Sequence, residues 1–374
     1  MSITEKHYFA LMRSALWGSP VAIDEAIDWK AVLQLAQYHA TNTLVSGTAS
    51  LMTGDNKPSD EVLAKMKNAM RSNLVSQLNL KQILLSSVKA LRDFGVEPVL
   101  LKGFALAMLY PNPNLRQFGD VDLYVGLDNF HQACEAVRKG LPNAYNWGGE
   151  VDSGKHYNLE FGNYALEVHR ISADVIDPKE NAAYAAIELE GLKQHAQKVD
   201  FEGFPLTIPS KEFMVFFTFY HAWHHFLTTG VGWKQIADVA ITLHAYRGQL
   251  DHDTLRRYFT DMHVLKPWQA FGYLMVHYLG LPEEEMPFYN PSVASTAQRL
   301  YARIMEEGNF KRDRSFKRRR PKRRLGQKMH AFVGIFVDFF HLAKVFPASA
   351  WREMRNSLGH AFAKNLPHGE KNGH

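Results

Sequence analysis

The chain has 374 residues, with 43 Lys and Arg against 38 Asp and Glu, and a formal net charge of +5 at pH 7. Ten basic residues and one acid fall within residues 311–324 (KRDRSFKRRRPKRR), so the rest of the chain is net negative. This distribution excludes a generally cationic surface of the kind that coats nucleic acid. With 46% hydrophobic and 22% charged residues, the composition is that of a globular protein. The single Cys134 excludes an intramolecular disulfide and a multi-cysteine metal centre.

Neither a signal peptide nor an uninterrupted apolar stretch of membrane-spanning length is recognisable. We therefore expect a cytoplasmic protein.

The first 95 residues predict a helical N-terminal region. Apolar residues recur at helical spacing over 29–39 and over 61–94, and Gly95 follows where a helix of that length would end.

Residues 96–208 predict a unit of mixed strands and helices. Short apolar or alternating runs indicate strands, and longer periodic runs indicate helices. The strands are expected at 96–101, 119–125, 156–161 and 164–169, with a Gly162-Asn163 turn between the last two, and the helices at 104–110 and 128–139.

Residues 209–310 again show helical periodicity and predict a C-terminal helical domain. Its helices are expected at 211–227 with Ser210 as N-cap, 233–246, 254–262, 267–279 and 291–307. Residues 311–374 hold the basic run, an apolar stretch and a polar tail. The predicted fold class is α+β, a small mixed sheet flanked by helical regions.

Two acids stand at alternate positions of the strand predicted at 119–125. Asp120 and Asp122 therefore share one face of the sheet, roughly 6–7 Å apart along the strand. Carboxylates so close repel each other unless a cation lies between them, and Mg²⁺ prefers oxygen ligands. The alternative to a cation site is that both acids lie on a solvent-exposed face of the strand without a ligand. Glu167, on a later strand beside His169, is the candidate third carboxylate.

Basic residues and a glycine surround these acids in the sequence. Lys102 and Gly103 lie at a strand-to-helix junction, where glycine lets the backbone approach a phosphate, and Arg116 precedes the acids. Three carboxylates with these cations are the parts that metal-dependent phosphoryl transfer needs.

The stretch LLKGFALAMLYPNPNLRQFGDVDLYV at 100–125 resembles the core of the polymerase-β-like nucleotidyltransferases. Within that superfamily it resembles a bacterial nucleotidyltransferase family with an LKG…Y…R…D-h-D-hhV signature. His156, the run Glu167–Arg170 and the run Trp233–Ala240 match its later stretches, and the similarity spans about 80–245. The glycine pair or Gly-Ser usual in the superfamily is Lys102-Gly103 here.

The resemblance implies a transferase that moves a nucleoside monophosphate from an NTP, such as ATP, to an acceptor hydroxyl. Asp120, Asp122 and Glu167 would be the catalytic carboxylates and the ligands of Mg²⁺ or Mn²⁺. Lys102, Gly103, Arg116 and His169 would bind the nucleotide and its phosphates. The acceptor, whether small molecule, protein or RNA, is not indicated. The alternative is a non-catalytic protein of this fold that binds membrane or nucleic acid through the basic run.

Three other features have open interpretations. His221 and His225 share a helix face, which suits either zinc ligands or partly buried residues lining a cleft. Asp238, among apolar residues, is expected to be a buried partner for Arg or His. The run 311–324 is a linker or a contact for nucleic acid or anionic lipid. The apolar segment 331–346 either lies in a membrane interface, giving peripheral contact through 311–346, or packs as a core helix.

Overall fold

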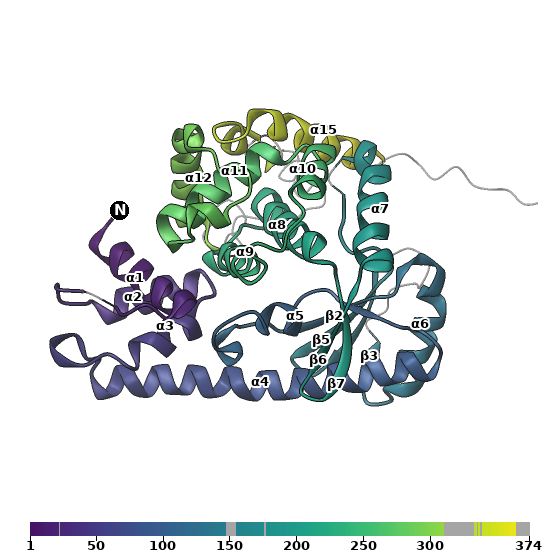
Figure 1. Cartoon of the computed structure of the whole chain (residues 1–374), viewed down its shortest axis with the longest axis horizontal. Coiled ribbons are helices and arrows are strands. Elements are labelled where there is room, and N and C mark those ends of the chain that lie inside the picture. Colours follow the sequence, from purple (N-terminus) through teal and green to yellow (C-terminus); the bar gives the residue numbers. More distant parts are fainter. Residues whose placement is uncertain are drawn as a thin grey trace, which may run out of the picture.

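The computed structural model describes residues 1–309, with gaps at 22, 147–154 and 176, and residues 333–363, with gaps at 335, 337 and 338. Helices form the N-terminal region, as predicted, and a long helix, α4, runs along the whole lower edge of the molecule (Figure 1). Ser59 caps its start, and Gly95, at φ 77°, follows its last turn as predicted. The elements are α1 (Ile3–Trp17), α2 (Trp29–Tyr38), α3 (Asn42–Ala49), η1 (Gly54–Asn56) and α4 (Asp60–Asp93).

A seven-stranded mixed sheet forms the middle of the protein, in the order β3-β4-β5-β2-β1-β7-β6. The β2–β5 and β1–β7 pairs are parallel, and the other pairs are antiparallel. This arrangement confirms the predicted α+β class. The strands are β1 (Val99–Leu100), β2 (Asp120–Tyr124), β3 (Tyr145–Asn146), β4 (His156–Phe161), β5 (Tyr164–His169), β6 (Gln197–Phe201) and β7 (Phe204–Ile208).

The β4 and β5 strands occupy the predicted residues, whereas β1 is shorter than predicted and the β6–β7 hairpin was not predicted. Pro205 within β7 masks the strand pattern in the sequence, because proline is disfavoured in strands. The short helices between strands are α5 (Phe104–Ala107), η2 (Pro113–Leu115), α6 (Gly126–Gly140), η3 (Pro178–Glu180), α7 (Asn181–Leu189) and the π-helical turn η4 (Glu190–Gln194).

Helices α8 to α12 stack above the sheet (Figure 1). They lie close to the predicted positions, and Ser210 caps α8 as expected. The predicted helix at 267–279 continues from α11 into a π-helical turn, η5. The bounds are α8 (Lys211–Thr228), α9 (Trp233–Ala245), α10 (His252–Asp261), α11 (Leu265–Leu274), η5 (Met275–Leu279), η6 (Glu283–Glu285), η7 (Pro291–Val293) and α12 (Ala294–Glu307).

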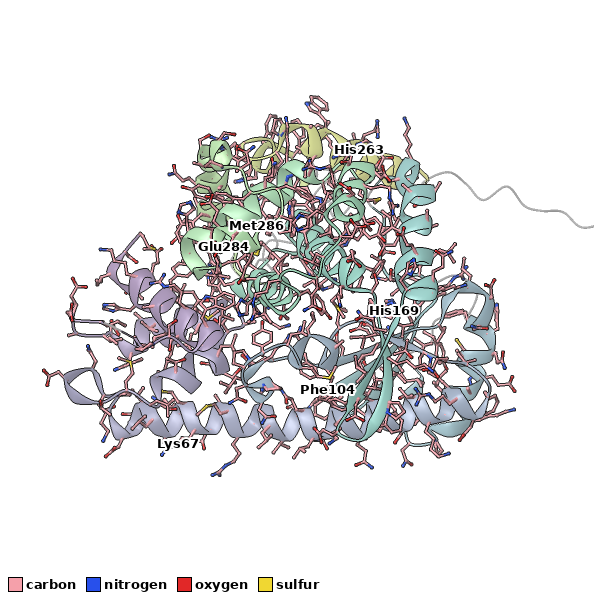
Figure 2. All side chains as sticks on the ribbon, viewed as in Figure 1. Lys67, Phe104, His169, His263, Glu284 and Met286 are labelled. Atoms are coloured by element: carbon pink, nitrogen blue, oxygen red, sulfur yellow. The ribbon has the colours of Figure 1, made fainter. Side chains whose placement is uncertain are left out.

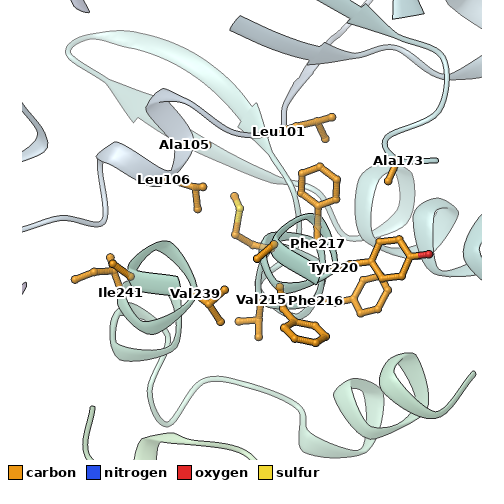
Figure 3. Close-up of a cluster of buried hydrophobic side chains, with 14 of the residues drawn as sticks. Leu101, Ala105, Leu106, Ala173, Val215, Phe216, Phe217, Tyr220, Val239 and Ile241 are labelled. Carbon is orange, nitrogen blue, oxygen red and sulfur yellow. The ribbon is translucent and has the colours of Figure 1, made fainter. Parts of the chain in front are cut away.

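The aromatic helix α8 joins the sheet to the helical domain. Its side chains Phe216 and Phe217 lie in one apolar cluster with Leu101 and Leu106 of the β1–α5 segment, and α9 contributes Ile241 (Figure 3). Burying aromatic rings of this size contributes strongly to stability. The strand-to-helix junction after β1 is therefore fixed by core packing.

The end of the described chain packs on this same core. The Phe346 ring lies edge-on to Trp223, with centroids 5.1 Å apart, and Leu342 and Val345 are buried. The last residues of the apolar segment thus pack in the core, whereas Val333, Phe336 and Phe340 earlier in it are exposed. A final helix, α15 (Pro347–Ala363), was not predicted. The basic run 311–324 lies outside the described residues. Among those that are described, no helix has the length and hydropathy needed to cross a membrane.

Candidate functional site

Neighbouring strands β2 and β5 bring the three candidate carboxylates together. In the parallel register Asp122 pairs with Glu167, and Asp120 lies two residues earlier on β2. Since side chains alternate along a strand, all three lie on one face of the sheet. Asp122 is fully buried, whereas Asp120 and Glu167 line a cavity of about 780 Å³. The strand pairing thus places a carboxylate set at a cavity wall.

Two basic groups contact the buried Asp122. The Nζ of Lys102 and the Nε2 of His169 each lie 3.0 Å from its Oδ1, while its Oδ2 has no hydrogen-bond partner within the described residues. Burial raises the pKa of Asp122, but Lys102 and His169 outweigh burial and hold the pKa below its usual range. Asp122 is therefore an anion with one oxygen available.

The second acid, Asp120, has the opposite shift. The charge of Asp122, and then burial, raise the pKa of Asp120 above its usual value. A cation bound between the two acids would remove this repulsion, and Asp122 Oδ2 supplies a free ligand atom for it. The residues present thus fit a hard divalent ion.

His169 lies where the sheet meets the overlying helices (Figure 2). Its Nε2 is also 3.2 Å from Glu167 Oε2. Burial disfavours the imidazolium, but hydrogen bonds to Asp122 and Glu167 outweigh burial and raise the pKa of His169. His169 therefore links the two carboxylate strands.

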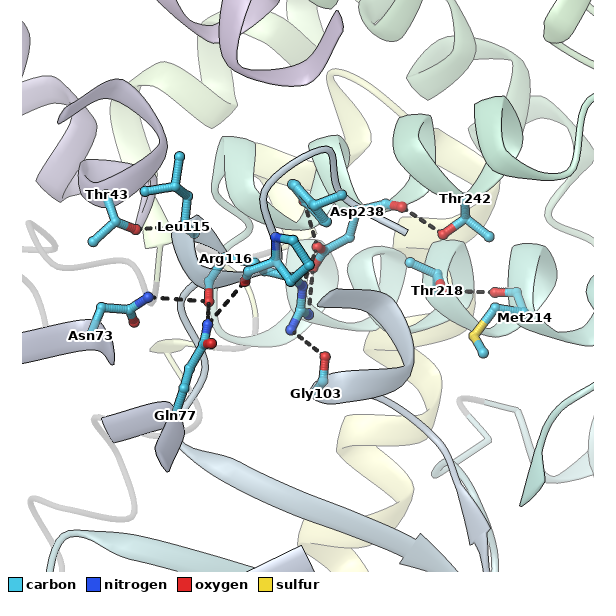
Figure 4. Close-up of polar contacts among 12 residues, drawn as sticks. Thr43, Asn73, Gln77, Gly103, Leu115, Arg116, Met214, Thr218, Asp238 and Thr242 are labelled. Carbon is cyan, nitrogen blue, oxygen red and sulfur yellow. Dashed lines mark hydrogen bonds and ion pairs between the residues drawn. The ribbon is translucent and has the colours of Figure 1, made fainter. Parts of the chain in front are cut away.

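Gly103 is required by the backbone at the junction after β1. Its φ of 59° is unfavourable for other residues, and a Cβ there would lie 3.3 Å from the carbonyl oxygen of Asp120. Arg116 Nη1 donates a hydrogen bond of 2.9 Å to the Gly103 carbonyl (Figure 4). This junction is therefore held close to the carboxylates.

The Arg116 guanidinium is bound by a protein carboxylate. Its Nε and Nη2 donate to the two oxygens of Asp238 at 2.7 and 3.0 Å (Figure 4). The hydroxyl of Tyr110 also donates to Asp238, at 2.7 Å. Arg116 is only 3% exposed, and its carbonyl accepts a hydrogen bond from Gln77. The prediction that Asp238 is a buried partner for an arginine is confirmed.

The cavity extends between the sheet and helices α8 and α9. Its lining includes His221 and His225, as the cleft interpretation of these residues expected. Their Nε2 atoms lie 3.0 Å apart, and burial lowers the pKa of both rings. The pair is therefore uncharged near neutral pH.

Lys234 provides an amino group in the cavity with no hydrogen bond or ion pair to any described residue. Burial, and then the charge of Arg116, lower the pKa of Lys234 to about 8. The other cavity lysines, Lys102 and Lys155, are paired with Asp122 and, at 3.6 Å, with Asp174. Lys234 is thus the lysine available to an anionic ligand.

The sequence profile of a family described as uncharacterised nucleotidyltransferase matches residues 25–280. The chain belongs to this nucleotidyltransferase family. The match spans more than half of the chain and includes the carboxylates, the Lys102-Gly103 junction and Lys234, so the resemblance noted in the sequence is confirmed.

The solved structures to which the chain is similar include an antigenic nucleotidyltransferase-like protein from Paracoccidioides brasiliensis. The two share 15% identity with a TM-score of 0.37, over 56% of this chain and 94% of that one. No curated protein matches this nucleotidyltransferase-family chain.

Lys234 was given no role from the sequence. It stands one helical turn before Asp238 on α9, a signal that the two side chains point to the same side. His156 lies directly across from His169 in the β4–β5 register, which two alternating runs joined by a tight turn already implied. The long-range contact that brings α9 to the sheet could not be predicted from the sequence.

Proposed function

We propose that this protein is a divalent-metal-dependent nucleotidyltransferase that moves a nucleoside monophosphate from an NTP to an acceptor hydroxyl and releases pyrophosphate. The observation that carries the proposal is the set of three carboxylates on one face of β2 and β5, of which Asp120 and Glu167 line a cavity that Lys234 also lines and Asp122 is buried beside them. Membership of the nucleotidyltransferase family supports it.

In the proposed reaction, the acceptor oxygen attacks the α-phosphorus, the bond from that phosphorus to the bridging oxygen of the β-phosphate breaks, and pyrophosphate leaves. The acceptor proton passes to a cavity carboxylate, for which Glu167 is the candidate. Asp120, Asp122 and Glu167 would hold Mg²⁺ or Mn²⁺, which when bound neutralises charge developing on the phosphate oxygens.

The basic residues divide into two groups under this proposal. Lys102 neutralises Asp122, and Arg116 positions Gly103, so both act through protein groups. The amino group of Lys234, which has no hydrogen bond or ion pair to any described residue, contacts the phosphates of the NTP. An anion beside it would further stabilise its ammonium form, because an opposite charge raises a lysine pKa.

The test is label transfer from each α-labelled NTP, with Mg²⁺ or Mn²⁺ and a cell extract as the source of acceptor. We expect labelling by the wild-type protein and none by Asp122→Asn or Glu167→Gln. Asp174→Asn is the matched control, since Asp174 lines the same cavity outside the carboxylate set. Absence of label with every NTP, or equal labelling by Asp122→Asn, would overturn the proposal.

A further inference from the structure

Two histidines flank Glu167 on the sheet face that carries the carboxylates. In the antiparallel β4–β5 register, His156 is opposite His169 and Asn158 is opposite Glu167. Opposite residues point to the same side, as do residues two apart, so both imidazoles and the carboxylate share one face. Strand pairing alone therefore gathers two nitrogen donors and one oxygen donor.

The donor atoms converge closely. Glu167 Oε2 lies 3.2 Å from His169 Nε2 and 3.8 Å from His156 Nε2, and all three atoms lie within 4.8 Å of one another. Ligands bonded to one ion at about 2.0–2.2 Å are separated by roughly 3–4 Å, so small side-chain movements would complete such a site. All three residues line the cavity, which leaves room for further ligands.

A simpler interpretation is that the cluster holds no metal and His169 only forms hydrogen bonds to the carboxylates. The surroundings of His156 do not support it. At 3.8 Å its Nε2 is too far from Glu167 for a hydrogen bond, and its Nδ1 is buried with no partner among the residues described. Neither ring nitrogen of His156 therefore has a hydrogen-bond partner among the described residues, although buried polar atoms usually have one. A bound metal ion would occupy its Nε2, the nitrogen nearer to Glu167.

We propose that His156, Glu167 and His169 bind one divalent transition-metal ion of the Zn²⁺, Co²⁺ or Fe²⁺ class. Imidazole nitrogen suits these ions, whereas Mg²⁺ prefers oxygen ligands alone. The site shares Glu167 with the carboxylate set, and in this respect it rests on the proposed nucleotidyl transfer. It adds a nitrogen-ligated position beside Asp120 and Asp122, whose donors are oxygens.

The experiment uses the full-length protein stripped of metal and needs no turnover. Co²⁺ is added and its visible absorption bands are followed, and Zn²⁺ is then titrated against the Co²⁺ form. We expect one Co²⁺ per chain, displaced by Zn²⁺ but not by about a hundredfold excess of Mg²⁺. His156→Ala should weaken Co²⁺ binding at least about tenfold, in line with the cost of disturbing a metal site.

His224→Ala and His221→Ala are the matched controls, because both histidines line the same cavity outside the trio. They should bind Co²⁺ like the wild type. The proposal is overturned if the wild type shows no Co²⁺ bands, if Mg²⁺ displaces Co²⁺, if His156→Ala binds normally, or if His221→Ala loses the ion. Thermal melts check that each variant folds. Label transfer with Mg²⁺ alongside a failed Co²⁺ titration would refute this site and leave the proposed function standing.

Discussion

The buried Arg116–Asp238 pair offers the sharpest test of how the site is held in place. Asp238 is 4% exposed and accepts three hydrogen bonds, two from Arg116 and one from Tyr110. Asp238→Asn would keep the shape but leave a buried guanidinium without its counter-charge. Removing one partner of a buried ion pair costs about 3–5 kcal/mol, because the remaining charge is neither solvated nor compensated.

We expect Asp238→Asn to lower the free energy of unfolding by about 3 kcal/mol. This value is at the low end of the range for buried ion pairs, because the asparagine side chain still accepts hydrogen bonds. The assay is urea unfolding followed by circular dichroism, comparing midpoints and slopes. Asp93→Asn is the control, since Asp93 pairs with Lys89 on the exposed surface of α4. An exposed pair of this kind contributes only about 0.5 kcal/mol.

A double variant separates charge from packing. Arg116→Met with Asp238→Leu removes both charges and should recover more than half of the lost stability, because apolar residues of similar volume replace buried pairs well. A midpoint for Asp238→Asn equal to that of Asp93→Asn would refute the reasoning. A double variant less stable than Asp238→Asn would also refute it.

Three further outcomes follow from the site. Lys234→Met should raise the free energy of unfolding at pH 7 by up to about 3 kcal/mol, because the pKa of Lys234 falls from 10.5 to about 8 on folding. Between pH 8 and 10.5 the lysine is protonated in the unfolded chain but not in the folded one, so the free energy of unfolding of the wild type should rise with pH and that of the variant should not. Urea titrations at pH 7 and 9.5 measure this difference. Gly103→Ala should cost about 1–3 kcal/mol in the same assay because of its positive φ, whereas Gly119→Ala, with no atom near its Cβ position, should be neutral. Mg²⁺ or Mn²⁺ should raise the melting temperature of the wild type. Without metal, Asp120→Asn should melt at a higher temperature than the wild type, because the repulsion between residue 120 and Asp122 is gone. Added metal should not raise the melting temperature of this variant, which lacks one carboxylate ligand, and a metal-dependent rise would contradict the assignment.

Much of the local structure could be predicted because it depends on neighbours in the sequence. Alternation of polar and apolar residues was enough for β4 and β5, and Ser210 and Gly95 mark helix ends through their own backbone chemistry. The helix α15 and the β6–β7 hairpin were not predicted. Their stability depends on packing against distant segments, such as the contact of Phe346 with Trp223 next to α15.

The role of each cation near the carboxylates could not be predicted in the same way. Lys102, Arg116 and Lys234 have the same charge in the sequence, and Lys102 and Arg116 were the expected triphosphate contacts. Which of them is paired depends on where Asp122 and Asp238 lie in space. Phe9 packs edge-on against Trp233, and the backbone N–H of Lys234 donates to the His39 carbonyl, so N-terminal helices hold the start of α9 at the cavity. A local sequence pattern cannot predict a contact between residues nearly two hundred positions apart.

The sequence by itself determined the carboxylate set, since Asp120 and Asp122 share a strand face by alternation alone, and it determined the glycine junction at Lys102-Gly103. Only the tertiary structure decided which basic residues are bound by protein acids and which remain for a ligand. The physical reason is that alternation is a property of one strand, whereas the pairing of a buried charge depends on every segment packed around it.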